Sequence, residues 1–400
     1  MRRFLRLTVP VLVAAVAAVA MTPAAATAAG APGWRIVQVL PNMTVDGVTA
    51  LGAADAWLSG DSCGNAQCST DTLIVRHWDG KAWRAVTPPK AFIDSPIGQG
   101  AGPVVATSAS NAWVFAYRGK DEVDYTDALH WTGKGWAAPV ELDMNIASAV
   151  APSASDVWAF GAPESSTAFA YVAHYNGKTW TQAPFPIMVT FASALSPSDI
   201  WVAGAANSQL GPSSFAIEHW NGHVWQKTPL PDLGIAAGTP AAIAGITAVA
   251  ARDAWAEVAV LYPPCSARPD GAAAKPSCTA PADDGVANSA SDSSVNTYLL
   301  HWNGTAWTRV AFRYPGMAVT PAVSDGHGGI WLTVDVISGS SSTLWFCHFS
   351  DGRWTRTAVP KERGKQPSVV YLSWIPGTRS LWAAGTDTAG NGSSILKYGP

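Results

Sequence analysis

The sequence predicts an all-β fold, a seven-bladed β-propeller in which each blade has four antiparallel strands. Three observations predict it. Of the 400 residues, 20 are Trp and only 13% are charged, about half the usual charged fraction. A Trp-containing motif recurs seven times along the chain, and each copy divides into four short strands, as in propeller blades. The last copy of the motif lacks its final strand, and the N-terminal part of the chain contains a matching one.

The composition also excludes several classes of protein. Apolar residues make up 48% of the chain, too many for a disordered protein. The net charge is −3, without the basic excess typical of nucleic-acid binding. We therefore expect neither nucleic acid nor an anionic membrane surface among the partners.

The repeat is clearest in its third and fourth copies. The third copy reads Ser-Ala-Ser-Asp-Val-Trp-Ala-Phe-Gly at 153–161 and His-Tyr-Asn-Gly-Lys-Thr-Trp at 174–180. The fourth copy repeats this pattern at 196–204 and 219–225. The His occurs in six copies, and Lys397 replaces it in the seventh. The first Trp recurs in all seven copies, as Trp57, Trp113, Trp158, Trp201, Trp255, Trp331 and Trp382.

Each copy divides into four short strands, called a to d, and the third copy serves as the example. Strand a is the small-residue run at 146–151, and a Ser/Asp turn leads to strand b at 157–161. A variable loop leads to strand c at 170–175, and an Asn-Gly pair, a strong hairpin signal, leads to strand d from Trp180. Small side chains place strand a next to the crowded axis of the ring, and large ones fill the space between the outer strands.

The two ends of the chain are expected to meet in one blade. The seventh copy stops at Pro400, before its closing Trp, whereas residues 33–37 read Gly-Trp-Arg-Ile-Val and match the start of a strand d. We predict that a strand containing Trp34 pairs into the C-terminal blade and closes the ring. Closure of this kind removes exposed sheet edges.

These D-x-W and H-W-N-G-x-x-W repeats resemble the Trp-rich propeller repeats of secreted actinobacterial proteins, and more distantly those of kelch, tectonin and Asp-box propellers. The resemblance covers nearly all of the mature chain and implies the propeller fold. It leaves the function open, because such propellers serve as lectins, scaffolds and enzymes. A likeness to galactose oxidase implies copper held by Tyr and His, but the ligand positions have no counterparts here.

Residues 1–28 have the features of a secretory signal peptide. Arg2, Arg3 and Arg6 precede an apolar stretch at 7–21, which is short for a membrane span, and Ala-Thr-Ala follows at 26–28. We expect a secreted, extracellular protein in which residues 29–400 form a single propeller domain without a membrane span. Blade five carries an insertion at about 261–296.

The five Cys residues fit an oxidising compartment. Cys63 and Cys68 are close in sequence, and Cys265 and Cys278 flank a Pro/Ala-rich loop. Both pairs are interpreted as local disulfides. Cys347 lies in an apolar run and is expected to be a buried free thiol. The spacing of Cys and His residues does not match a metal site.

An Asp two residues before the first Trp and the repeated His are expected to form a hydrogen bond within each blade. Strands b and c are antiparallel, so the start of b lies beside the end of c, and buried polar groups need partners. Asn111, Gly329 and Ser380 replace the Asp in blades two, six and seven, where we expect a weaker contact. The four predicted pairs are Asp55–His77, Asp156–His174, Asp199–His219 and Asp253–His301.

Eighteen of the 20 Trp residues occupy repeat positions, so we interpret them as core rather than as sugar-binding surfaces. Function is expected in the loops that differ between blades, which are the b–c and d–a connections on one face of the ring. These candidate loops are residues 61–71, 90–102, 117–127, 207–214 and 261–296.

One of these loops is locally acidic and aromatic. Tyr117 and Tyr125, with Asp121 and Asp124, form a candidate ligand-binding edge, for example for a sugar. A calcium site is the alternative, because carboxylate oxygens are calcium ligands, although the spacing matches no EF-hand; a solvated loop without bound metal is the default. The candidate calcium ligands are Asp121, Glu122, Asp124 and Asp127.

Three carboxylates are candidates for acid–base catalysis. Glu257 replaces the Phe found two residues after the first Trp in blades two and three, and Asp335 and Asp61 both end strand b. Carboxylates flanking a pocket serve as acid and base in glycoside hydrolysis. The structural alternative is that Asp61 and Asp335 are solvated strand ends and that Glu257 has a local hydrogen-bond partner.

The sequence therefore favours a secreted, monomeric binding or scaffold module that engages an extracellular protein or glycan through its b–c and d–a loop face. Apart from the calcium alternative, no cofactor is expected. The second hypothesis is an extracellular glycoside hydrolase or lyase that uses carboxylates near the axis of the ring. The two hypotheses differ in how many acids converge on that face.

Overall fold

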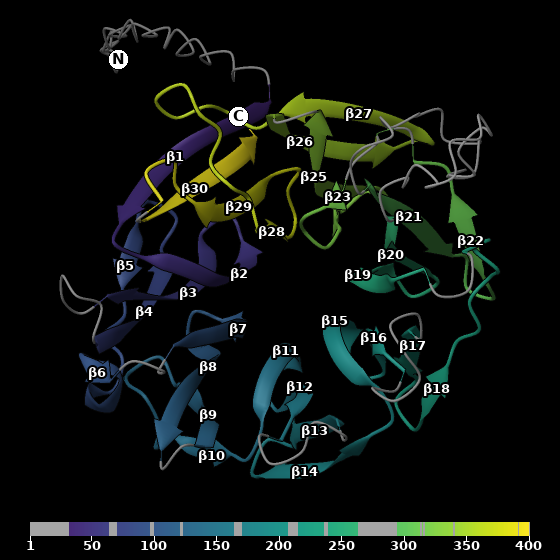
Figure 1. The fold of residues 1–400 in the computed structure, drawn as a ribbon. Helices are drawn as coiled ribbons and strands as arrows, with labels where there is room; N and C mark the ends of the chain where they lie inside the picture. The colour runs from purple at the N-terminus through teal and green to yellow at the C-terminus, as the bar shows by residue number, and fades with distance from the viewer. Residues whose placement is uncertain are drawn as a thin grey trace, which may run out of the picture.

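The computed structural model describes one ring of seven β-sheets (Figure 1), which confirms the predicted all-β, seven-bladed propeller. The predicted signal peptide at 1–28 and most of the insertion at 261–296 lie outside the described residues. Within the described residues, no helix is long and apolar enough to cross a membrane. The described residues are 32–63, 70–96, 100–120, 123–163, 170–206, 215–235, 239–262, 294–312, 314, 317–338, 341–390 and 392–399.

The blades follow one another along the chain, and each runs from an inner strand a to an outer strand d. Blades one and two comprise β2 (Thr44–Gly52), β3 (Asp55–Cys63), β4 (Thr70–Trp78) and β5 (Trp83–Ala85), then β7 (Ala101–Ser108), β8 (Asn111–Lys120), β9 (Val123–Trp131) and β10 (Val140–Leu142). Between them lie a 3₁₀-helix, η1 (Lys90–Phe92), and β6 (Ser95–Pro96), which pairs with β4.

Blades three and four have the same order. Blade three comprises β11 (Asn145–Ser153), β12 (Asp156–Ala162), β13 (Ala170–Tyr175) and β14 (Trp180–Phe185). Blade four comprises β15 (Met188–Ser196), β16 (Asp199–Ala205), β17 (Phe215–Trp220) and β18 (Trp225–Lys227).

Blade five comprises β19 (Ala241–Ala250), β20 (Asp253–Tyr262), β21 (Ser294–Trp302) and β22 (Trp307–Val310). In blade six the inner strand is divided into β23 (Met317–Ala318) and β24 (Val323–Ser324), followed by β25 (Ile330–Ser338), β26 (Ser341–Ser350) and β27 (Arg353–Ala358). Blade seven comprises β28 (Tyr371–Trp374), β29 (Leu381–Thr386), β30 (Gly392–Gly399) and β1 (Gly33–Pro41).

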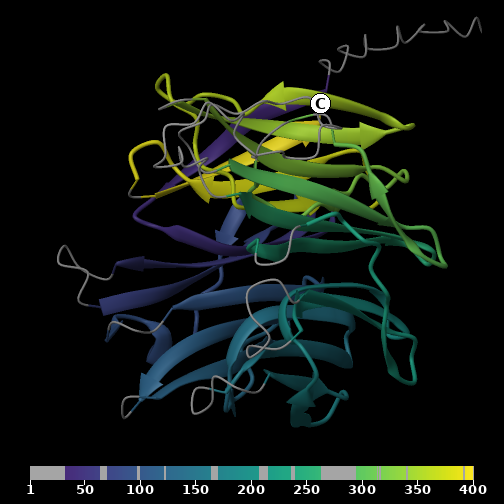
Figure 2. The same cartoon turned by 45° about the vertical axis from the view of Figure 1, so that its right-hand side comes forward.

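The inner strands surround the axis, and each contacts the inner strand of the next blade in the order β2, β7, β11, β15, β19, β24 and β28, which returns to β2 (Figure 1). Figure 2 shows the sheets of neighbouring blades packed face to face. Such packing buries both faces of most strands, which explains why the chain has few charges.

The N-terminal strand closes the ring as predicted. β1 is the outer strand of blade seven and pairs antiparallel with β30, with Trp34 opposite Tyr398. The Trp34 ring stacks on Phe346 of blade six at 3.7 Å between centroids, and its side chain is 8% exposed. The first and last strands of the described chain therefore stabilise each other and join the core between blades six and seven.

Tryptophan contacts join the blades to one another. All seven strand-b Trp residues are buried, which confirms their prediction as core. In five interfaces the strand-b Trp meets the strand-d Trp of the following blade edge to face, with centroids 5.3–5.8 Å apart. These pairs are Trp113–Trp180, Trp158–Trp225, Trp201–Trp307, Trp331–Trp34 and Trp382–Trp83.

The four predicted Asp–His hydrogen bonds are present. The pairs Asp55–His77, Asp156–His174, Asp199–His219 and Asp253–His301 join Oδ1 to Nε2 at 2.7–2.9 Å. In blade two, Asn111 lies 3.3 Å from His130 Nε2, a longer contact as expected. In blade seven, the Lys397 ammonium lies over the Trp382 ring instead.

The prediction that the repeated His forms a weaker contact in blade six is wrong. His348 Nε2 lies 2.9 Å from Oδ2 of Asp325, whose other oxygen accepts the backbone N–H groups of His327 and Gly329. A Cβ on Gly329 would lie 2.4 Å from Asp325 Oδ2. The glycine therefore makes room for an Asp that comes from the preceding turn and replaces the missing one.

Glu257 stabilises the divided inner strand of blade six. Its side chain is 0% exposed, and Oε1 accepts the Ala322 N–H at 2.8 Å. Because β19 has a glycine opposite, the carboxyl fits between blades; a Cβ on Gly245 would lie 2.0 Å from Oε2. Burial raises the pKa of Glu257 to about 7. This position confirms the structural alternative, a local hydrogen-bond partner, and gives the carboxyl no access to solvent.

Cys347 is a buried free thiol, as predicted, and burial raises its pKa to about 12. A thiol with so high a pKa is rarely ionised and therefore unreactive. Of the residues in the two predicted disulfides, Cys68, Cys265 and Cys278 lie outside the described residues, and Cys63 is the last residue of β3.

The first prediction concerns closure of the ring. The substitution Trp34→Ala removes the stacking on Phe346 and the edge contact with Trp331, and should lower the free energy of unfolding by about 4 kcal/mol. Denaturant unfolding measures the change. Val37→Ala is the matched control, because Val37 lies in the same strand and is 41% exposed. Equal losses in the two variants would contradict the closing role of Trp34.

The second prediction concerns pH. Because the pKa of Glu257 rises from 4.5 in the unfolded chain to about 7 in the folded one, the folded protein holds a proton in this window that the unfolded chain releases. The free energy of unfolding therefore falls as the pH rises from 4.5 to 7.

The substitution Glu257→Gln should reduce this fall by about 3 kcal/mol, because the amide does not titrate. Urea unfolding between pH 4.5 and 8 measures the slope, and Asp143→Asn, at an exposed site, is the control. A slope that is the same in Glu257→Gln and in the wild type would show that the carboxyl is not buried as described.

Candidate functional site

In each blade, strand a begins and strand b ends on the same face of the ring. This face carries the b–c and d–a loops, which vary between blades. In blade one, Thr44 at the start of β2 pairs with Asp61 near the end of β3. Loops on a rigid scaffold are common binding sites. Side chains that depart from the repeat on this face are therefore the first candidates for function.

Asp46 is the clearest departure. The register of β2 passes from Val45–Gly60 to Gly47–Ser59, so Asp46 is the extra residue of a β-bulge. The same bulge occurs in blades three, four and five, where the extra residue is Ala147, Thr190 and Ala244 respectively. Ala147 and Thr190 are exposed. The repeat therefore accepts a small neutral residue here and does not require an acid.

The carboxyl of Asp46 is poorly solvated. The residue is half-buried, and its Oδ2 is buried without a hydrogen-bond partner among the described residues. Burial and, to a smaller extent, the negative charge of Asp61 raise the pKa of Asp46 to about 7, and the nearby Thr44 side chain opposes the rise. Asp46 is therefore a carboxyl that changes charge near neutral pH.

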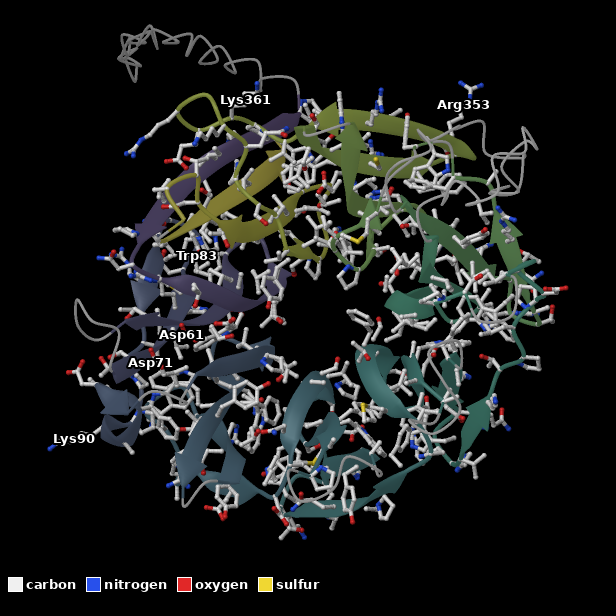
Figure 3. The ribbon with its side chains drawn as sticks, viewed as in Figure 1. Asp61, Asp71, Trp83, Lys90, Arg353 and Lys361 are labelled. Atoms are coloured by element: carbon white, nitrogen blue, oxygen red, sulfur yellow. The ribbon has the colours of Figure 1, made fainter. Side chains whose placement is uncertain are left out.

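Asp61 lies beside Asp46 and connects two blades. Its Oδ1 accepts the Thr44 hydroxyl at 2.6 Å, and its Oδ2 accepts the backbone N–H of Ala101, the first residue of β7, at 3.4 Å. Asp61 is one of the residues predicted from the sequence. Here it lies between blades one and two, on the left of Figure 3.

Tyr117 reaches from blade two to blade three. Its hydroxyl donates a hydrogen bond to the Ile146 carbonyl at 2.5 Å. The start of β7 leaves room for its ring, because a Cβ on Gly102 would lie 3.4 Å from two ring atoms. Burial raises the pKa of Tyr117, and the charge of Asp46 adds to the effect. This tyrosine was also predicted as a ligand-binding residue.

Tyr371 completes the group from the other side. It is the first residue of β28 in blade seven. Burial, followed by the charges of Asp46 and Tyr117, raises its pKa to about 12. Asp46, Asp61, Tyr117 and Tyr371 therefore influence one another's charge across three consecutive blades, and we call these four residues the acid–tyrosine cluster.

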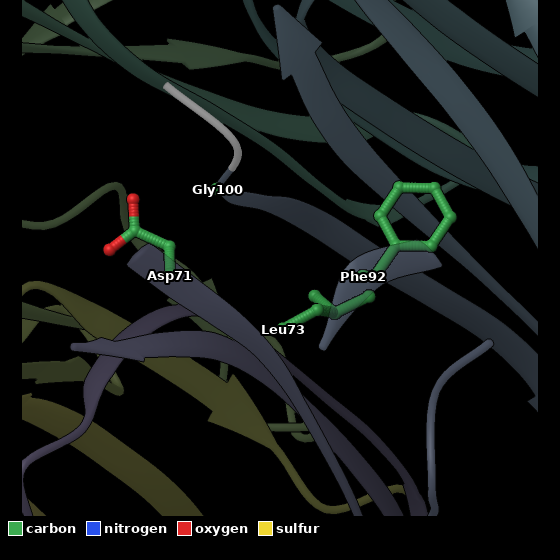
Figure 4. Close-up of a pocket in the computed structure, with 4 residues that line it drawn as sticks. All are labelled: Asp71, Leu73, Phe92 and Gly100. Carbon is green, nitrogen blue, oxygen red and sulfur yellow. The ribbon is translucent and has the colours of Figure 1, made fainter. Parts of the chain in front are cut away.

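A shallow hollow adjoins the cluster at the rim of blade one (Figure 4). Asp71, Leu73, Phe92 and Gly100 line it, and it is too narrow to enclose a water molecule. Gly100 belongs to both features, because a Cβ there would lie 3.3 Å from Asp61 Oδ2 and 3.9 Å from the Tyr117 ring. The cluster and the hollow therefore form a continuous surface.

The other predicted ligand and calcium residues do not join this cluster. Asp127 is 2% exposed, and its Oδ2 lies 2.8 Å from Nε of Arg118, which also pairs with Glu141. Tyr125 pairs with Arg118 across β8 and β9, and Asp124 pairs with Gly119. Asp121 and Glu122 lie outside the described residues. In the described part of the chain, no three His, Cys, Asp or Glu side chains are grouped to hold a metal.

The three candidate catalytic carboxylates are in separate blades. Glu257 is fully buried in blade five, and neither Asp61 nor Asp335 contributes to the shift of its pKa. Asp335 of blade six accepts a hydrogen bond from the Ser342 hydroxyl and pairs with Met317. Asp61 alone belongs to the acid–tyrosine cluster, so the acid pair expected for a hydrolase is not formed by these residues.

Asp46 and Tyr371 were not among the residues predicted from the sequence. Asp46 had a visible signal, because alignment of the inner strands puts an acid where blades three, four and five have Ala, Thr and Ala. Tyr371 had a weaker signal, because β28 is irregular and its nearness to Asp46 depends on closure of the ring.

Comparisons with known proteins support the fold. No protein-family model matches the sequence, and no curated protein matches it. Among solved structures, YCF48 from Cyanidioschyzon merolae is similar, with a TM-score of 0.53 and 13% identity over 91% of this chain and 98% of that chain.

Two further structures have the same overall shape. YCF48 bound to a D1 peptide gives a TM-score of 0.50 with 12% identity, and covers 91% of this chain and 94% of that chain. A polysaccharide lyase of family PL25, an ulvan lyase, gives 0.51 with 11% identity, and covers 90% and 95%. At such low identity the likeness establishes the propeller fold alone, and the fold is shared by binding proteins and enzymes.

Proposed function

We propose that this chain is a secreted binding module that engages an extracellular protein or glycan through its b–c and d–a loop face, with the acid–tyrosine cluster at the centre of the site. One observation carries the proposal. Asp46 places a buried carboxylate oxygen, unpartnered among the described residues, at a position that blades three, four and five fill with Ala or Thr.

Such a carboxyl destabilises the fold, because desolvation of a polar group without a hydrogen bond costs free energy. Residues that break the local rules of a fold without a structural gain are expected at functional sites. The half-buried rings of Tyr117 and Tyr371 add the aromatic surface that is common in binding sites.

Two further observations support binding over catalysis. Glu257 is out of reach of solvent, and Asp335 lies in another blade from Asp61. A propeller of similar shape has been solved with a bound peptide, so the fold is compatible with a protein ligand. Secretion is proposed from the apolar N-terminal segment with its leading arginines.

The test is a binding screen that compares the wild type with a variant in which a large side chain covers the cluster. The mature protein is applied to a glycan array and to a peptide array, next to the variant Thr44→Trp. Thr44 is exposed at the start of β2, so a Trp there should cover the cluster and weaken binding at least about tenfold. Met188→Trp, at the corresponding position of blade four, is the matched control and should bind like the wild type.

Three results would count against the proposal. The first is that the protein binds nothing on either array. The second is that Thr44→Trp binds as well as the wild type. A parallel polysaccharide-cleavage screen gives the third, because turnover that is lost in Asp46→Asn would assign the cluster to an enzyme.

A further inference from the structure

The outer strand of blade six and the turn that follows it carry a local excess of positive charge. Residues 353–365 contain five Lys or Arg side chains and one acid, Glu362, in a chain whose net charge is −3. All five cations are exposed, and none forms an ion pair with a described carboxylate. Figure 3 shows Arg353 and Lys361 at the outer rim of the ring. We call the five residues the basic rim: Arg353, Arg356, Lys361, Arg363 and Lys365.

The turn after β27 is a two-residue hairpin. Glu362 and Lys365 pair through two backbone hydrogen bonds. The two residues between them, Arg363 and Gly364, have φ angles of 48° and 84°, and two positive values are typical of a type I′ turn. A long side chain is uncommon at a positive φ, so the conformation of Arg363 costs stability that Asn or Gly there would not.

Side-chain hydrogen bonds hold this hairpin between blades six and seven. The Gln366 amide donates to the Val359 carbonyl, and its oxygen accepts the Leu344 N–H, both at 2.9 Å. These bonds fix the hairpin against the end of β27. On the other side, the Glu362 carboxylate accepts the Ser394 hydroxyl of β30 at 3.1 Å. The one acid of the stretch is therefore engaged with blade seven, and the hairpin holds its cations in a defined place.

Arg356 extends the basic rim along β27. Its guanidinium carbon lies 4.3 Å from the centre of the Trp345 ring and 4.9 Å from that of the Tyr314 ring. Cation–π contacts of this kind orient a side chain that is otherwise free at the surface. The N–H groups at the edge of a stacked guanidinium bind an oxyanion through two parallel hydrogen bonds.

We propose that the basic rim binds a linear anionic polysaccharide, a glycan that carries carboxylate or sulfate groups along its chain. The surface is separate from the acid–tyrosine cluster, so the inference goes beyond the proposed function and does not depend on that cluster. It follows from the juxtaposition, along one outer strand and its hairpin, of five exposed cations without a described counter-charge. A strand of six residues such as β27 spans about 20 Å, which suits a linear ligand better than a single small anion.

The composition of this surface favours a polysaccharide over a protein. Stable protein interfaces have an apolar core with large buried side chains. The exposed large apolar side chains of the described chain all lie outside residues 353–366. A nucleic acid is also a polyanion, but the proposed secretion places the protein outside the cell.

The experiment measures the affinity of the full mature protein for five immobilised polymers by biolayer interferometry. The polymers are polygalacturonate, dextran sulfate, neutral dextran, poly-L-glutamate and double-stranded DNA. At least one of the two anionic polysaccharides should bind at 50 mM NaCl, and neutral dextran should not. Because salt screens exposed charges, the affinity should fall at least about tenfold between 50 and 200 mM NaCl.

Variants of the hairpin test the position of the charge. The triple variant Lys361→Gln, Arg363→Asn and Lys365→Gln should weaken binding at least about tenfold. Asn tolerates a positive φ, so the turn should keep its shape. The matched control removes three exposed lysines from the c–d turns of blades one, two and three; it has the same net charge and should bind like the wild type. It is the triple variant Lys81→Gln, Lys134→Gln and Lys178→Gln.

Thermal unfolding checks that both triple variants are folded. If the hairpin variant is not, its three single substitutions replace it, and each should weaken binding about threefold. Thr44→Trp, which covers the acid–tyrosine cluster, should leave binding of the anionic polysaccharide unchanged.

Five outcomes would overturn the inference. Neither anionic polysaccharide binds, or neutral dextran binds as tightly. The hairpin variant and its control lose equal affinity. Poly-L-glutamate or DNA binds more tightly than both anionic polysaccharides, or Thr44→Trp abolishes polysaccharide binding.

The two proposals can fail separately. If Thr44→Trp blocks an array ligand but neither anionic polysaccharide binds, only the inference about the basic rim is wrong. If an anionic polysaccharide binds at the basic rim and no array ligand is affected by Thr44→Trp, only the site proposed at the acid–tyrosine cluster is wrong.

Discussion

The structure depends on the edge-to-face contact between the strand-b Trp of one blade and the strand-d Trp of the next. A four-stranded sheet cannot bury both of its faces alone, so each blade needs a neighbour. An aromatic pair of this geometry adds about 1 kcal/mol to the burial of its area. The contact is repeated at five blade interfaces, so that its contributions add up around the ring. Trp34 supplies the partner of Trp331, so the contact between blades six and seven is complete only when the N-terminal strand is in place.

The fold could be predicted because its determinants repeat. A Trp or an Asp–His pair that returns in every blade can be recognised without knowing any distance, and the closing strand follows from the incomplete seventh copy. The prediction of a weaker His contact in blade six was wrong because it considered only the repeat position of the Asp. A carboxylate from another part of the chain can occupy the same place. Asp325 comes from a turn that the repeat does not describe, and its carboxylate occupies the space that Gly329 leaves open.

The candidate site could be predicted only in part, for a related physical reason. Asp61 and Tyr117 were recognised because they stand near the end of strand b, where the connections that vary between blades begin. Tyr371 and Asp46 lie on inner strands, where the sequence suggested only small packing residues. Their proximity to each other is a consequence of ring closure, which places blade seven beside blade one. Residues far apart in the chain are brought together by topology, and a single sequence does not show which ones meet.

Glu257 and Asp46 show that a raised pKa does not identify a functional acid. Burial raises the pKa of each to about 7. Glu257 is fully buried, and its carboxyl accepts the Ala322 N–H where the inner strand of blade six is interrupted, so the fold gains a contact from it. Asp46 lies at a bulge whose equivalents in blades three and four are exposed, and one of its oxygens has no partner in the described chain. Each carboxyl has one buried oxygen without a hydrogen-bond partner among the described residues, so neither the raised pKa nor the unpartnered oxygen separates the two. The difference is one of position: Glu257 replaces a buried Phe of blades two and three in the core between blades, whereas Asp46 stands at a bulge that is exposed in blades three and four.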